Sequence, residues 1–137
     1  MIISKTLIRQ YAYDAGFRGT HLDAAVDIAV CESGLNINSH CLNCFEGIKE
    51  DSRGLWQINL NAHPQYKTVD LFNPKINAIA AFEVYKEAGS TFRPWFNCAT
   101  KLGYLNFPNT ESDDPEKKKL NLFAFVAIIG LYLLSKD

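Results

Sequence analysis

Apolar residues recur at helical spacing in two segments near the N-terminus. The first segment begins after Ser4, a residue type that caps helices, and stops at Gly16. The second begins at Thr20, which has the features of a capping box, and stops at Gly34. Its apolar positions repeat every three or four residues: Leu22, Ala25, Val26, Ala29 and Val30. The pattern predicts two helices, the second of which ends just after Glu32.

The middle of the chain changes from loop-forming residues to a short apolar run and then to a third helical pattern. Residues 36–53 are rich in Asn, Ser, Cys and Gly and predict loop and turn. Residues 54–60 predict a short strand, whose period of two would put Gln57 and Asn59 on one face. Asn73 and the proline after it then predict the start of a third helix. That helix is apolar on two faces, so we expect it to be buried.

The composition divides the chain into three predicted parts. Residues 1–107 form the folded domain, residues 108–119 a polar linker, and residues 120–137 a transmembrane or membrane-anchoring helix. The apolar stretch 120–134 would reach only about 22 Å as a helix, against roughly 30 Å of hydrocarbon core. We still favour an anchor, because the stretch has no polar face; a core or partner-docking helix is the alternative.

Charge and composition exclude some classes of protein. The chain has 137 residues and a formal net charge of -1, and its basic residues are not gathered into one face, so no nucleic-acid partner is expected. Hydrophobic residues make up 47% and aromatic residues 12%, which excludes disorder for most of the chain and supplies rings of the kind that carbohydrate clefts use. The first ten residues lack the long apolar run of a secretory signal peptide, and we expect none.

The four cysteines indicate disulfides or buried thiols rather than a metal site. Only Cys41 and Cys44 have the C-x-x-C spacing, so a four-thiolate site would require distant segments to converge. We therefore expect neither a metal nor a cofactor. Cys31 is expected to pair with one of the later cysteines, Cys98 being the first candidate, which would pin the second helix to the lower half of the domain.

Glu32 is the main candidate for catalysis. It is predicted in the last turn of the second helix, near the negative end of the helix dipole and beside apolar neighbours, and both disfavour its ionised form. A carboxyl with a raised pKa holds a proton near neutral pH, which a general acid in glycosidic cleavage requires. From position alone, an ordinary solvated glutamate before a helix-ending glycine is the competing interpretation.

Three short motifs, in this order, carry a family resemblance. Glu32–Gly34 at a helix end is followed by the run Gly54–Asn59 (GLWQIN), and then by Asn73-Pro74 with Tyr85 downstream. This order resembles the lysozyme-like superfamily, in particular the small lytic transglycosylases and lysozymes of phage and conjugation systems. The resemblance covers residues 24–95. It implies an α+β, mainly α fold with a small β element beside a cleft.

The resemblance also implies roles for individual residues. Glu32 would donate a proton to the leaving sugar oxygen, and Ser33 would orient that carboxyl or a sugar group. Gln57 and Asn59 would hydrogen-bond the sugar, and Tyr85 would lie near the acid; ordinary strand polarity is the alternative for the two amides. The implied partner is the glycan strand of peptidoglycan, cleaved between N-acetylmuramic acid and N-acetylglucosamine.

A second carboxylate would decide between two chemistries. A hydrolysing lysozyme commonly places one about 5 Å from the first for retention, or farther away for inversion. Asp51, just before the GLWQIN run, is our candidate, ahead of Glu50 and Glu46. Without a second carboxylate, the resemblance implies lytic transglycosylation, in which the sugar's own O6 closes a 1,6-anhydro ring and Glu32 acts as acid and then as base. We favour this single-carboxylate route.

Two non-catalytic interpretations remain open. One is a glycan-binding or structural virion module with a lysozyme-like fold, against which an intact Glu32 argues. The other is a membrane-anchored interaction protein, which rests on the tail alone. The three lysines at 117–119 would hold the domain on the cytoplasmic side, which suits a wall-cutting enzyme only if a particle carries it. We therefore expect a membrane-anchored enzyme, carried for instance in a phage virion, that acts on the bacterial cell wall.

Overall fold

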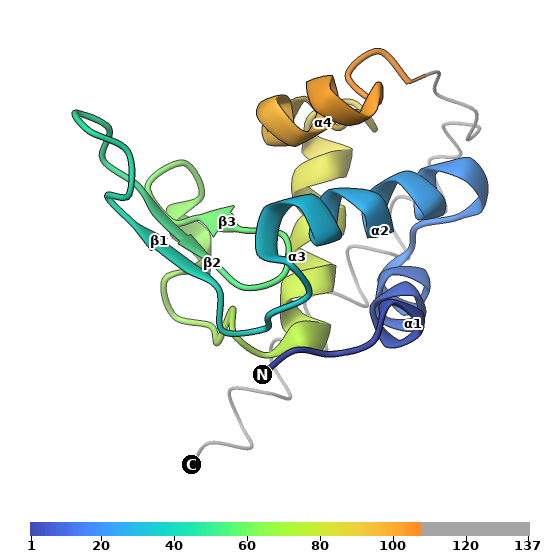
Figure 1. Cartoon of the computed structure of the whole chain (residues 1–137), viewed down its shortest axis with the longest axis horizontal. Coiled ribbons are helices and arrows are strands. Elements are labelled where there is room, and N and C mark those ends of the chain that lie inside the picture. The colour runs from blue at the N-terminus through green and yellow to red at the C-terminus, as the bar shows by residue number, and fades with distance from the viewer. Residues whose placement is uncertain (108–137) are drawn as a thin grey trace. The chain divides into compact units, whose positions relative to one another are not determined.

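Four α-helices, a three-stranded sheet and two short 3-10 helices make up residues 1–107, the part of the chain that this computed structural model describes (Figure 1). The mainly α, α+β class expected from the sequence is confirmed. The predicted linker and C-terminal helix, residues 108–119 and 120–137, lie outside the described residues. In chain order the elements are α1 (Lys5–Ala15), α2 (Gly19–Ser33), β1 (His40–Leu42), β2 (Asp51–Arg53), β3 (Ile58–Asn59), η1 (Pro64–Tyr66), α3 (Pro74–Glu87), η2 (Arg93–Trp95) and α4 (Phe96–Leu102).

The three long helices begin and end close to their predicted positions. Ser4 and Asn73 cap α1 and α3, each with a side-chain oxygen that accepts hydrogen bonds from backbone N–H groups of the first turn. Gly34 ends α2 in the left-handed conformation, with φ 58°. The predicted cap of α2 is wrong. The helix begins at Gly19 without a side-chain cap, so Thr20 lies inside the first turn and is not its cap.

An aromatic core joins α1, α2 and α3. Phe17, between α1 and α2, meets Phe82 of α3 edge-on, with ring centroids 5.0 Å apart, and its centroid also lies 5.0 Å from that of Tyr85. His21 is only 1% exposed, and its Nδ1 lies 2.6 Å from the hydroxyl oxygen of Tyr85. The core confirms that α3 is buried on both of its apolar faces.

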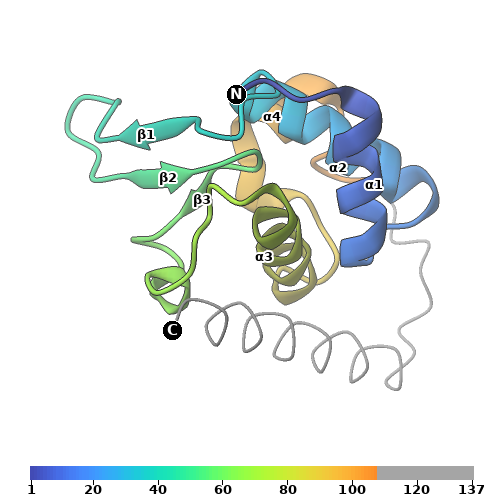
Figure 2. The same ribbon diagram turned by 90° about the horizontal axis from the view of Figure 1, so that it is seen from below.

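The small sheet is antiparallel in the order β1-β2-β3, and both Figure 1 and Figure 2 show it to one side of the helices. Its register pairs His40 with Arg53, Leu42 with Asp51, and then Ser52 of β2 with Asn59 of β3. Strands β1 and β2 lie within the segment predicted as loop, and that prediction is wrong. Each has only three residues, which is too short for an alternating pattern to emerge.

The GLWQIN run is mostly a turn, and the predicted strand over 54–60 is reduced to Ile58–Asn59. Gly54 has φ 79°, and a Cβ there would lie 2.2 Å from the carbonyl oxygen of Leu71, so only glycine fits without displacing the chain. Gln57 also has a positive φ, 47°. Because Gln57 is not in extended conformation, the period-two argument that placed it on one face with Asn59 does not apply.

One disulfide joins the end of α2 to α4, and the other lies at the end of β1. Cys31 and Cys98 join the last turns of α2 to α4 with Cα atoms 6.0 Å apart, which confirms the first candidate pairing. Cys41 of β1 pairs with Cys44, three residues later. All four cysteines of the sequence are therefore in disulfides.

Residues 1–107 form one compact unit. Within that unit, none of the helices combines the length and the apolar character needed to cross a membrane. The predicted membrane anchor is not part of this finding, because it falls beyond residue 107.

Candidate active site

Glu32 lies in the last turn of α2, at the end of the helix that leads towards the sheet (Figure 1). Burial, followed by the negative charge of Glu50, raises the pKa of this carboxyl from its ordinary 4.5 to about 7. The negative end of the α2 dipole lies at the same terminus and acts in the same direction. Near neutral pH, both the protonated and the ionised form of this group are therefore populated.

Glu50 precedes β2 directly and is half-buried. Its Oε1 accepts a hydrogen bond of 2.7 Å from the hydroxyl of Ser52, a residue that is 1% exposed. Its backbone is fixed by Asn43 across the hairpin: Asn43 N donates to Glu50 O at 2.8 Å, and Glu50 N donates to Asn43 Oδ1 at 2.9 Å. Glu50 is therefore the hairpin carboxylate that interacts electrostatically with Glu32.

Asp51 has different partners. Its two carboxylate oxygens accept hydrogen bonds from Arg53 Nε and Nη2, both at 2.9 Å, and His40 Nε2 lies 2.8 Å away. These bonds, those from Arg53 above all, hold the pKa of Asp51 below its usual range. Neighbouring strand residues point to opposite faces, so Asp51 and Arg53 share one face of β2 while Ser52 and Glu50 share the other. The charge that shifts Glu32 is that of Glu50, not that of the predicted Asp51.

Ser33 follows Glu32, and its hydroxyl donates to the carbonyl oxygen of Ala29, one turn earlier in α2, at 2.8 Å. This is a common way for serine to bond within a helix. In the structure the hydroxyl thus makes a hydrogen bond within the last turn of the helix. Its predicted role towards the acid or a sugar stays a prediction.

Gln57 and Asn59 both bond to the backbone of the β region. Gln57 Nε2 donates to the carbonyl oxygens of Ser39 and Gly54, at 2.9 and 2.8 Å, and so ties the segment before β1 to the turn. Asn59 Oδ1 accepts from Asn61 N at 2.9 Å. Both side chains are half-buried. Both side chains thus stabilise the backbone of the β region, and sugar binding by either stays a prediction.

Tyr85 lies far from the acid. It is 1% exposed, and its hydroxyl bonds to His21 in the first turns of α2, at the opposite end of that helix from Glu32. At 1.5 Å per residue, His21 and Glu32 are about 16 Å apart along the helix. Contrary to the prediction, Tyr85 therefore does not lie beside the acid, because its ring is part of the aromatic core.

Asn77 of α3 is a positioning residue that the sequence analysis missed. It is fully buried, and its Oδ1 accepts from Trp56 N at 2.8 Å. Its Nδ2 donates to the carbonyl oxygens of Arg53 and Leu71, at 2.8 and 2.9 Å. One side chain thereby holds the turn after β2 against α3. The signal for it was an asparagine within an otherwise apolar helix face, since buried amides need such partners.

The comparisons with known proteins agree with this arrangement. A family model described as a lysozyme-like domain matches residues 9–97, from within α1 to within α4. No curated protein and no solved structure matches the chain. The chain therefore belongs to the lysozyme-like domain family, as its motifs indicated. Membership supports a general role as a peptidoglycan glycosidase or transglycosylase.

Proposed function

We propose that the protein cleaves the β-1,4 bond between N-acetylmuramic acid and N-acetylglucosamine in peptidoglycan, with Glu32 as the general acid. The observation that carries the proposal is the pKa of Glu32, about 7, at a half-buried helix end that leads towards the sheet. A protonated carboxyl in such a place can protonate the leaving oxygen of a glycosidic bond. The membership of the lysozyme-like domain family supports the choice of substrate.

The preferred route is non-hydrolytic transglycosylation. Glu32 first gives its proton to the leaving sugar oxygen and then, as a carboxylate, takes the proton from the O6 hydroxyl that closes the 1,6-anhydro ring. One group serves well as acid and then as base when its pKa lies near the working pH, because both forms are then populated. A pKa of about 7 meets that condition near neutral pH.

Hydrolysis is the second candidate, and Glu50 is the observation that favours it. Its charge acts on Glu32, and its Oε1 accepts a hydrogen bond of 2.7 Å from the Ser52 hydroxyl, which fixes the orientation of the carboxyl group. A second carboxyl group near the general acid is what hydrolytic glycosidases use. In this route Glu50, rather than the predicted Asp51, would activate water or stabilise the developing positive charge.

Mass spectrometry of purified peptidoglycan after digestion distinguishes these routes. Anhydro ends support transglycosylation, and reducing ends support hydrolysis. We expect Glu32→Gln to lower the rate by about 10²–10⁴-fold on either route, because the amide cannot deliver a proton. A folded wild-type protein that gives no products, or a Glu32→Gln variant as fast as its parent, would leave the non-catalytic glycan-binding module as the better explanation.

The proposal extends to a lipid membrane as a partner of the apolar stretch 120–134. Its support is the composition of that stretch, which has no polar face. A chain that ends at Pro115 should no longer need detergent for solubility and should still cleave peptidoglycan. Equal detergent dependence of the two chains would remove the anchor from the proposal without affecting the catalytic part.

A further inference from the structure

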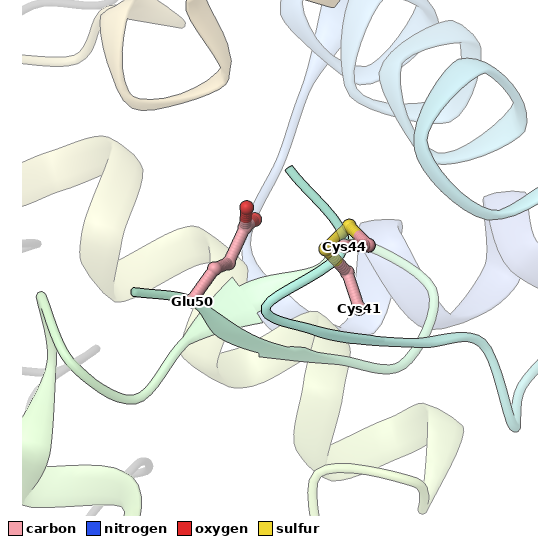
Figure 3. A group of neighbouring side chains, drawn as sticks. All are labelled: Cys41, Cys44 and Glu50. Carbon is pink, nitrogen blue, oxygen red and sulfur yellow. A yellow bond between two sulfur atoms is a disulfide. The ribbon is translucent and has the colours of Figure 1, made fainter. Parts of the chain in front are cut away.

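Three side chains that can bind metal meet where the loop of the β1–β2 hairpin begins and ends. The Sγ atoms of Cys41 and Cys44 and a carboxylate oxygen of Glu50 all lie within 4.8 Å of one another. Figure 3 shows the Cys41–Cys44 disulfide beside the Glu50 side chain. The proposed catalytic routes assign no task to the two sulfurs.

Backbone pairing holds Cys41 and Glu50 close together independently of the disulfide. Cys41 is paired with Ser52 in the β1–β2 ladder, two positions away from Asn43 and Glu50, which exchange hydrogen bonds of 2.8 and 2.9 Å. Asn43 also has φ 49°, which turns the chain sharply between the two cysteines. Opening the S–S bond therefore leaves Cys41 and Glu50 on paired segments of the hairpin, with Cys44 the next residue after Asn43.

The ligand types match zinc. Zn²⁺ takes cysteine sulfur and carboxylate oxygen in tetrahedral sites, and C-x-x-C is a common spacing for two of its ligands. Three protein ligands leave the fourth position to water, as in open zinc sites. Magnesium and calcium prefer oxygen ligands alone, so two sulfurs disfavour them.

The same pair of sulfurs is open to reduction. Cys44 is exposed and Cys41 half-buried, whereas Cys98 of the other disulfide is 8% exposed. A dithiol reductant can attack one sulfur to form a mixed disulfide, and its second thiol then closes the reductant's own disulfide. Two electrons and two protons pass to the protein, which leaves two cysteine thiols. When a metal binds, these thiols release their two protons to solvent.

We propose that the reduced hairpin is a zinc site whose protein ligands are Cys41, Cys44 and Glu50. The disulfide and the metal exclude each other, because both use the same two sulfurs. The hairpin then binds metal in a reducing compartment and forms the disulfide in an oxidising one. Because Glu50 is also the carboxylate that acts on Glu32, bound zinc would hold that carboxylate as a ligand. That consequence rests on the proposed function, whereas the site itself does not.

The test uses the full chain, reduced with a phosphine reductant under exclusion of oxygen and then titrated with Zn²⁺ in competition with a chromophoric chelator. We expect one tightly bound ion per reduced chain and none per oxidised chain. Alkylation and peptide mass spectrometry identify which cysteines were reduced. Equal zinc binding by the oxidised and the reduced chain would overturn the proposal.

Matched variants locate the site. Cys41→Ser with Cys44→Ser should abolish binding, whereas Cys31→Ser with Cys98→Ser should preserve it. The reverse result would assign the metal to the other pair and refute the proposal. Glu50→Gln should weaken binding at least about tenfold, since even partners of metal ligands contribute that much. An unchanged affinity would remove Glu50 from the ligand set and thus contradict the site as proposed.

Discussion

The effect of a hairpin carboxylate on the pKa of Glu32 depends on its position in the strand. Burial accounts for most of the raised pKa of Glu32, and Glu50 adds to it. Asp51, next to Glu50 in sequence, has a lowered pKa because Arg53 donates to it on the other face of the strand. Two adjacent carboxylates of similar chemistry therefore have opposite relations to the acid.

Replacing the two hairpin carboxylates separates their effects on Glu32. Glu50→Gln removes a nearby negative charge, so the pKa of Glu32 should fall by about one unit or less, burial being the larger cause. Asp51→Asn is the matched control and should leave that pKa unchanged. NMR titration of the isotope-labelled Glu32 carboxyl measures this directly. An equal shift in both variants would show that the assignment of Glu50 is wrong.

The raised pKa of Glu32 also predicts how stability depends on pH. Between pH 4.5 and about 7 the folded chain keeps the proton that the unfolded chain has released. The free energy of unfolding should therefore fall as pH rises through this window and level off above it. Glu32→Gln should remove this slope and stabilise the fold by roughly 1–3 kcal/mol at pH 8 but not at pH 4. Urea denaturation at both pH values tests this, and a wild-type slope in the variant would contradict it.

At the scale of elements, the turn from Gly54 to Gln57 determines how the sheet meets the helices. Gly54 lies close to the Leu71 carbonyl and the Asn77 side chain, and Gln57 ties the turn back to Ser39. Asn77, from α3, bonds the carbonyl oxygen of Arg53 just before the turn and the N–H of Trp56 within it. The hydrogen bonds from Asn77 to these backbone groups thus help to position the sheet against α3.

Two glycines with similar backbone conformation test this close contact. Gly54 and Gly89 have φ of 79° and 74°, but only at Gly54 would a Cβ meet other atoms, at 2.2 Å from Leu71 O. Gly89→Ala should cost about 1–2 kcal/mol of unfolding free energy from backbone strain alone. Gly54→Ala should cost at least about 2 kcal/mol more, because neighbouring atoms must also move. Denaturant midpoints compare the two, and equal costs would mean that the contact is unimportant.

The sequence predicted those features that depend on local signals. Capping residues and apolar spacing located the long helices, and with them Glu32. The hairpin strands were missed because they are short and are defined by pairing with each other. Glu50 was ranked below Asp51 because strand register decides which carboxylate is on the side of the acid. Tyr85 was misplaced because a motif gives no direction for a side chain on a helix that is buried on several faces.

For the whole molecule, the two disulfides should contribute unequally to stability. Cys31 and Cys98 are separated by 67 residues, whereas Cys41 and Cys44 are separated by only three. From chain entropy, the long loop is worth about 4 kcal/mol and the short one about 2 kcal/mol. Cys31→Ala with Cys98→Ala should therefore lower the melting temperature more than Cys41→Ala with Cys44→Ala. Calorimetry of both double variants measures this, and the opposite order would contradict it.

The bond between Cys31 and Cys98 closes a covalent ring that contains Glu32, Glu50 and the whole GLWQIN turn. A peptidase that nicks an exposed loop inside this ring therefore leaves two pieces that remain joined near the acid. A cut before Cys31 or after Cys98 leaves the ring itself intact. Glu32, Glu50 and the GLWQIN turn should thus stay covalently linked in surroundings rich in proteases for as long as that single cross-link survives.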